Sequence, residues 1–279
     1  MRRPPGGRLA PVAAELVGAI AALRMKAVHS GEADLVRSPY VTSDSRQVLN
    51  VTRDTTPATA GTVVSQIDPP TLCAFRALVA GALRRLKWRH SGLGMLQAYV
   101  LEGSQHEVRV HIWHPSLKLP GIDGAGLGHD HRFDMTSWVL IGQLTHVDVL
   151  TSADPTGDWQ VYEVVNARKA LKETQTRAGE FRLVEGSLRL DRHRMSISAG
   201  GVYFFPKRLF HETYAFSQLV ITLVLKTNQD ELPARVLCRR GREILNAFGT
   251  PLPAAQCESI LAEAEAALLN ADSPNTSQF

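Results

Sequence analysis

Between residues 95 and 226 the sequence divides into many short β-prone runs that are separated by turn residues. The candidate strands are 95–102, 107–114, 137–150, 159–165, 181–188, 192–198, 202–206 and 211–226. Two of these runs, 137–150 (about Gly142) and 211–226, are each long enough for two strands. So many short strands at close spacing are typical of a β-sandwich or a barrel, and not of a parallel sheet. We therefore expect a mainly β core.

The segments on both sides of this region carry apolar residues at helical spacing. On the N-terminal side they are 11–28 and a run that starts at Asp68-Pro69-Pro70 and ends near Gly92. An Asp followed by prolines is a common helix start. On the C-terminal side they are 232–248 and 254–269. We predict three regions: a helical N-terminal region (1–94), a β-barrel (95–227) and a helical tail (228–279).

Charge and cysteine content narrow the class of protein further. The net charge is +4, and the basic residues are scattered apart from one short cluster at 84–89, which predicts no nucleic-acid partner. Three cysteines lie far apart and give no disulfide framework, which suits a reducing compartment. No signal peptide or membrane-spanning run is evident. We expect a cytoplasmic protein with no membrane partner.

Two stretches of sequence carry candidate metal ligands. His129 and His131 are two residues apart, so on a strand their imidazoles point to the same face. The second stretch, 200–211, reads as a strand followed by a turn that delivers His211. Imidazole is a suitable ligand for Fe, Zn, Cu and Ni. The sequence therefore predicts a metal site formed by these three histidines.

The first stretch resembles the first signature of the cupin superfamily, which is H-x-H, then three or four residues, Glu, six residues and Gly. His129, His131 and Gly142 match that spacing, and Met135 stands at the Glu position.

The second stretch resembles the second cupin signature, in which Gly200, Pro206 and His211 match and Arg208 replaces an inner glycine. The resemblance covers about residues 95–226. It implies a cupin-type double-stranded β-helix, or jelly-roll barrel, with helical flanks, and it favours a homodimer.

The loss of the carboxylate at Met135 leaves three neutral ligands. This pattern is similar to that of the three-histidine non-haem iron oxygenases, chiefly the thiol dioxygenases related to cysteine dioxygenase. The resemblance implies Fe(II), O2 and a small metal-chelating substrate that binds through sulfur. Cysteine dioxygenase carries an Arg that clamps the substrate carboxylate before its first metal ligand. That Arg has no counterpart in 95–101, so cysteine is not the expected substrate.

Strand 107–114 alternates strictly between polar and apolar residues. Arg109, His111 and Trp113 share one face of it. If this face looks into the barrel, Arg109 is placed to bind a substrate anion, His111 to shuttle protons and Trp113 to contact substrate. The alternative is that this polar face meets solvent.

Three further residues are candidates for the site. Tyr203 is a candidate catalytic hydrogen-bond donor, with a structural role in the barrel wall as the alternative. Arg132 and Met135 flank the metal motif and are candidate substrate contacts. The remaining histidines of the β region, at 106, 114, 146 and 193, are expected in loops or on the surface.

Two other functions fit the same motif. One is a redox-neutral isomerase or lyase in which Zn, Mn or Ni acts as a Lewis acid, and the donor set also accepts Cu. The other is a non-catalytic cupin that binds a ligand, which the long helical flanks favour.

Overall fold

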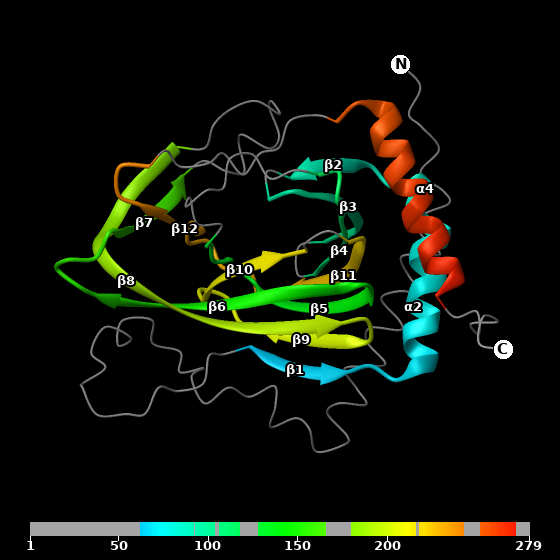
Figure 1. The fold of residues 1–279 in the computed structure, drawn as a ribbon, viewed down its shortest axis with the longest axis horizontal. Coiled ribbons are helices and arrows are strands. Elements are labelled where there is room, and N and C mark those ends of the chain that lie inside the picture. Colours follow the sequence, from blue (N-terminus) through cyan, green and yellow to red (C-terminus); the bar gives the residue numbers. More distant parts are fainter. Residues whose placement is uncertain are drawn as a thin grey trace.

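The computed structural model describes residues 62–91, 93–103, 106–117, 128–165, 180–215, 218–242 and 252–271. The helix expected at 11–28 lies outside the described residues, as does most of the glycine-rich segment 121–128. Within the described part the chain is mainly β, with two antiparallel sheets and few helices (Figure 1). The predicted mainly β core is therefore confirmed.

The larger sheet has seven strands in the order β1-β9-β5-β11-β4-β3-β2. Their bounds are β1 Val63–Gln66, β2 Trp88–Ser91, β3 Met95–Glu102, β4 Glu107–Trp113, β5 Asp134–Ile141, β9 Gly201–Phe205 and β11 Val220–Thr227. Non-consecutive strands are neighbours in this order. Segments far apart in the sequence are thereby brought onto one surface.

The smaller sheet has five strands in the order β10-β6-β8-β7-β12. Their bounds are β6 Gln143–Ala153, β7 Trp159–Val165, β8 Glu180–Ser198, β10 Phe210–Tyr214 and β12 Arg235–Arg239. Isolated bridges from His129 to His211 in β10 and to Val236 in β12 join the two edge strands. The smaller sheet is therefore closed through the segment that carries His129.

Two helices, α2 (Pro69–Ala82) and α4 (Ala254–Asn270), cover one face of the larger sheet (Figure 1). The Asp68 side chain caps α2 by accepting a hydrogen bond from the Thr71 backbone N–H at 3.0 Å. Buried residues of both helices, such as Phe75 and Leu261, pack in one cluster with Val110 and Ile112 of β4. The apolar face of β4 is thus turned towards the helices, which directs its polar face the other way.

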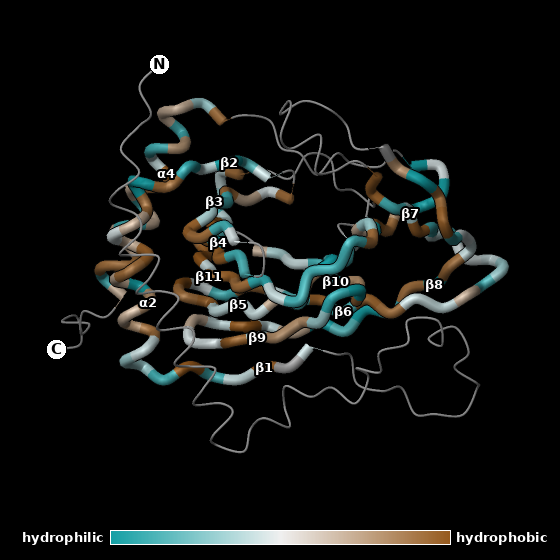
Figure 2. Tube along the Cα trace, turned by 180° about the vertical axis from the view of Figure 1, so that it is seen from behind, coloured by the Kyte–Doolittle hydropathy of each residue, from teal (hydrophilic) through white to brown (hydrophobic). Residues whose placement is uncertain are grey.

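A second core lies between the two sheets. Leu144 of β6 and Ile197 of β8 pack there against larger-sheet residues such as Val139, Phe205 and Val220. Figure 2 shows β11 as a largely apolar strand and β10 as a largely polar one. The candidate metal site, which includes His211 of β10, therefore lies where polar side chains border a mainly apolar core.

The helix expected over 232–248 is wrong in its described part, because Arg235–Arg239 forms strand β12. This segment pairs along its whole length with β7. Its backbone also bonds to the chain beside His129, with Leu237 N–H donating to the Gly128 carbonyl oxygen at 2.7 Å. Tertiary pairing here overrides a helical spacing of apolar residues.

The β structure extends beyond 95–227 on both sides, because β1 and β2 precede it and β12 follows it. The runs 181–188 and 192–198, expected as separate strands, form the single long strand β8. Gly142 separates β5 from β6 as expected, with a φ of 75° that favours glycine. Among the described helices, none is long and apolar enough to cross a membrane.

Candidate metal centre

His129 and His211 come from segments that are paired through their backbones. The His129 N–H donates to the His211 carbonyl oxygen at 3.1 Å, and the His211 N–H donates back to His129 at 2.9 Å. His131 follows two residues after His129, just before β5 begins. Two distant stretches of sequence therefore present their histidines from one short antiparallel pair.

The three imidazoles form a compact cluster. One ligating nitrogen from each of His129, His131 and His211 lies within 4.8 Å of the other two. Their ring centroids are 4.4 Å to 4.8 Å apart. Nδ1 of His211 is buried and has no hydrogen-bond partner among the described residues. Three convergent imidazoles with an unsatisfied buried nitrogen fit a first-row transition metal ion.

The surroundings of His131 and His211 favour the neutral imidazole, which is the form that binds metals. Burial lowers the pKa of His131 well below its usual value, and the charges of His129, Lys226 and Arg109 lower it further. Burial also lowers the pKa of His211, with further contributions from His129, His131 and His146.

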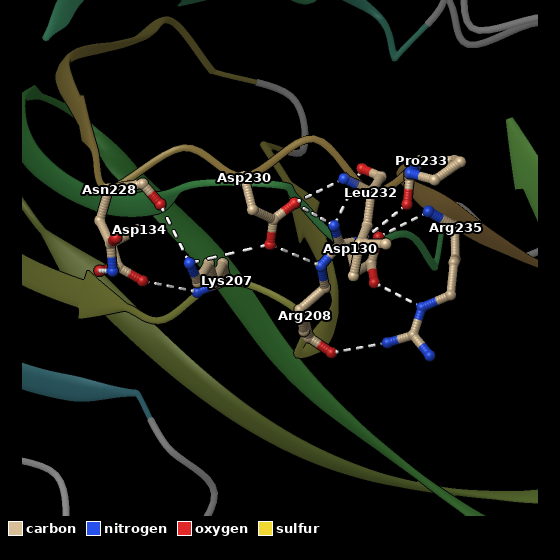
Figure 3. Close-up of polar contacts among 9 residues, drawn as sticks. All are labelled: Asp130, Asp134, Lys207, Arg208, Asn228, Asp230, Leu232, Pro233 and Arg235. Atoms are coloured by element: carbon tan, nitrogen blue, oxygen red, sulfur yellow. Dashed lines mark hydrogen bonds and ion pairs between the residues drawn. The ribbon is translucent and has the colours of Figure 1, made fainter. Parts of the chain in front are cut away.

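A hydrogen-bond network joins the three chain segments that carry or flank the histidines (Figure 3). The Asp130 carboxylate accepts from the Arg235 backbone N–H at 2.5 Å and from its Nε at 2.7 Å. The Arg235 guanidinium donates to the Arg208 carbonyl oxygen at 2.9 Å. The Arg208 N–H in turn donates to the His131 carbonyl oxygen at 3.0 Å. Asp130 thus points away from the imidazoles and fixes the backbone between two of them.

Arg208 occupies the position where the cupin signature has glycine, and its φ of 71° is in the left-handed region. Its guanidinium forms an ion pair with Asp230 and donates to the Pro233 carbonyl oxygen at 2.6 Å (Figure 3). These contacts offset the backbone strain. They explain how a long side chain is accommodated at a turn next to His211.

Met135, at the position of the cupin carboxylate, is buried and opposes Phe205 on β9 and Lys226 on β11. The Phe205 ring lies 4.1 Å from the His211 ring, centroid to centroid. A buried carboxylate does follow His211, but Glu212 lies on the other face of β10 and bonds Arg192 and Tyr214. The cluster of ligand atoms within 4.8 Å therefore consists of histidines in the described part of the chain.

His146 was expected in a loop or on the surface, and this expectation is wrong. It lies in β6 with 0% exposure, and its ring stacks on that of His211 at 5.4 Å. Its Nε2 is 3.0 Å from Asp148 Oδ1 and 3.2 Å from Thr62 Oγ1. The alternation Leu144, His146, Asp148 was the signal in the sequence that could have placed this histidine on an interior face.

Tyr203, the candidate catalytic donor, is buried in β9 with its ring 5.1 Å from that of His146. Burial raises its pKa to about 12, so the phenol keeps its proton at neutral pH. It packs in the core between the sheets. The structure thus places it beside the stacked pair His146 and His211.

The polar face of β4 turns into the protein, as one of the two sequence alternatives predicted. Trp113 lies in the core between the sheets and His111 packs edge-on against it at 5.7 Å. His111 is buried, and its Nε2 has no hydrogen-bond partner among the described residues. Burial, with the charges of Arg109 and Lys226, lowers the pKa of His111 to about 3. Arg109 bonds Tyr99 and Glu107.

Arg132 is half-buried, and its carbonyl oxygen accepts a hydrogen bond from the Asp230 N–H at 2.8 Å. Burial and the charge of Arg109 lower the pKa of Lys226 well below its usual value, and the charge of Arg132 contributes to this. Lys226 itself was missed at the sequence level. It lies among the apolar residues of β11, and the strand periodicity alone does not reveal its partners.

The fold and the cluster together define a mainly β protein with a three-histidine site suited to a metal ion. No protein-family model and no curated protein matches the chain. Similar solved structures include the DMSP lyase DddQ from Ruegeria pomeroyi, with 13% identity and a TM-score of 0.36 over 80% of this chain and 95% of that one. An RmlC-like cupin from Shewanella frigidimarina has 14% identity and a TM-score of 0.29 over 53% and 88%. An oxalate decarboxylase from Lactobacillus farciminis has 11% identity and a TM-score of 0.30 over 53% and 32%. Similarities of this size place the chain in no family.

Proposed function

We propose that this chain is a cupin-type oxygenase that binds one Fe(II) ion through His129, His131 and His211. Its substrates are O2 and a small molecule that chelates the metal, with a thiol as one such molecule. The observation that supports the proposal is the convergence of three imidazoles in a site where the buried Met135 stands at the position of the cupin carboxylate.

A site with three neutral ligands leaves the full charge of a divalent ion uncompensated, so it favours an anionic or bidentate substrate. When bound, Fe(II) supplies open coordination positions and the redox chemistry for reaction with O2. The same imidazoles accept Zn, Mn, Ni or Cu, which would instead support Lewis-acid chemistry. The identity of the bound metal therefore distinguishes an oxygenase from a Lewis-acid enzyme.

The protein's own residues shape the site. Phe205 and Phe133 pack on the imidazoles of His211 and His131, with centroid distances of 4.1 Å and 4.6 Å, and exclude water from one side of the cluster. Tyr203 retains its proton and is available only as a neutral hydrogen-bonding group. Arg109, the proposed substrate contact, and His111, the proposed proton-transfer residue, line the interior face of β4.

The test begins with metal analysis of anaerobically purified protein, followed by O2-electrode traces with Fe(II) and a panel of thiols and other chelating metabolites. About one iron per chain with substrate-dependent O2 uptake is the expected result. His131→Ala should abolish both, whereas His106→Ala, in an exposed segment, should change neither. Full O2 uptake in the His131 variant would overturn the proposal.

Bound zinc with anaerobic turnover would favour the Lewis-acid enzyme, and tight ligand binding without turnover would favour a binding protein.

A further inference from the structure

The interior face of the larger sheet carries two basic side chains near the histidine cluster. Lys226 on β11 lies opposite Glu107 on β4, and Arg109 is two residues further along β4 on the same face. The side chains of Lys226, Arg109 and Glu107 are 8%, 15% and 25% exposed, respectively. These three groups therefore form one nearly buried charged cluster.

A single carboxylate serves both basic side chains of this cluster. One carboxylate oxygen, Oε2 of Glu107, lies 3.2 Å from the Lys226 ammonium and 2.8 Å from the Arg109 guanidinium. Nε of Arg109 is buried and has no hydrogen-bond partner among the described residues. Two basic groups thus share one carboxylate, and burial, with the charge of Arg109, lowers the pKa of Lys226 well below its usual value. A bound anion would stabilise the protonated form of Lys226 and accept a hydrogen bond from the unsatisfied Arg109 donor.

The charged cluster and the three histidines are joined by one aromatic ring. The Phe133 ring is stacked on the His131 ring at 4.6 Å with an interplanar angle of 16°. The Lys226 ammonium lies 3.9 Å from the centroid of the same Phe133 ring. Lys226 and His131 therefore contact the same ring, which places the charged cluster close to the candidate metal ligands.

We infer that Lys226 and Arg109 form an anion-binding subsite next to the metal position, and that the substrate carries a carboxylate in addition to the group that chelates the metal. This inference rests on the proposed function and specifies its substrate class as small metal-chelating molecules with a second, anionic end. Guanidinium and ammonium groups both bind carboxylates through charge-assisted hydrogen bonds. The polar and apolar alternation of β4 already indicated Arg109 as an anion-binding residue. Lys226 adds a second basic group from the neighbouring strand β11.

A purely structural role for Lys226 makes a different prediction. If its ammonium serves only Glu107 and the Phe133 ring, replacing it with Met would alter stability and leave ligand preference unchanged. Ligand preference therefore separates the two roles.

The probes are malate and its β-amide, which present the same α-hydroxycarboxylate to a metal and have nearly the same shape. Only malate adds a second carboxylate. Full-length protein is stripped with a chelator and titrated with Co(II) by calorimetry, and each probe is then titrated into the Co(II)-loaded protein. Wild-type protein should bind malate about tenfold more tightly than the amide, because a buried charge pair contributes at least that much.

Because Arg109 remains, Lys226→Met should lower the malate affinity several-fold towards that of the amide and leave the amide affinity unchanged. Lys226→Arg, which retains the charge, should keep the preference, and Lys87→Met, at an exposed position, should match wild type. In wild-type protein the preference should also shrink as ionic strength rises, since salt screens the contact. The ionic-strength measurement uses wild-type protein, so it tests the subsite even if Lys226→Met does not fold.

The possible failures are distinguishable. If the first titration shows no Co(II) binding to wild-type protein, the proposed metal site is overturned. If Co(II) binds and wild-type protein does not distinguish malate from its amide at any ionic strength, the subsite is overturned and the metal site stands. The same conclusion follows if a folded Lys226→Met variant retains the full wild-type preference.

Discussion

Arg235 holds the fully buried carboxylate of Asp130 at two points, through its backbone N–H and its Nε, while 31% of the Arg235 side chain remains exposed. Asp130 lies between His129 and His131, so this contact fixes the backbone on which two candidate ligands stand. Arg239, on the same strand as Arg235, pairs with Asp158, and the side chains of Arg239 and Asp158 are 46% and 52% exposed. The two pairs allow a direct comparison of a buried and an exposed ion pair.

We predict that Arg235→Met lowers the free energy of unfolding by about 3 kcal/mol, because it leaves a buried carboxylate without its cation. The matched change Arg239→Met should cost under about 1 kcal/mol. Urea denaturation of metal-free protein measures both. In metal titrations, only the Arg235 variant should bind Co(II) more weakly. Equal effects of the two changes would contradict a positioning role for the Asp130 contact.

Phe205 and Phe75 are both fully buried, but only Phe205 contacts the histidine rings. Replacing either with Leu should destabilise the protein by about 1–2 kcal/mol through lost packing. Phe205→Leu should also weaken metal binding about tenfold, because the imidazoles of His211 and His131 lose the ring that orients them. Competition with a fluorescent chelator measures this affinity. A similar loss of metal affinity in Phe75→Leu would mean that general destabilisation is responsible.

His111 should make stability depend on pH in the acid range. Its pKa is lowered to about 3, so it stays neutral in the folded protein while the unfolded chain binds a proton below about 6.5. The stability present above pH 6.5 is therefore lost as the pH falls towards 3. In metal-free protein, His111→Gln should reduce the slope of unfolding free energy against pH by up to about 1.4 kcal/mol per pH unit. Exposed His106→Gln should keep the wild-type slope, and an unchanged slope in the His111 variant would refute the prediction.

Gly142 and Gly241 have nearly the same positive φ, 75° and 76°, and differ in the space around them. A Cβ at Gly142 would overlap the backbone oxygen of Leu219, whereas a Cβ at Gly241 meets nothing within 4 Å. Gly241→Ala should cost about 1 kcal/mol from backbone strain alone. Gly142→Ala should cost roughly 3 kcal/mol or more, because the turn between β5 and β6 must shift. Thermal unfolding of both variants tests this, and equal costs would show that the turn yields freely.

Much of the β architecture was predictable from local patterns. The alternation of Glu107 to Trp113 predicted a strand, and the polar turn at Gly142 predicted the break between β5 and β6. The spacing of His129 and His131 also indicated two imidazoles on one side of the chain. These features are local, since they depend on the two-residue period of a strand and on residues that favour turns.

Other features depended on contacts between distant segments. The chain at Arg235–Arg239 has a helical spacing of apolar residues and became strand β12 because it pairs with β7 and with the backbone near His129. His146 was assigned to the surface, yet it packs on His211 from a neighbouring strand of the smaller sheet. Neither outcome can be read from a single segment, because each partner lies tens of residues away.

By itself, the sequence determined that this chain forms a mainly β core and offers His129, His131 and His211 as a candidate ligand set. Only the tertiary structure decided that these imidazoles converge, that the polar face of β4 turns inward, and that Lys226 joins Arg109 beside them. The physical reason is that strand periodicity fixes which side chains share a face. Which face is buried, and what meets it there, depends on how the two sheets and the two covering helices pack.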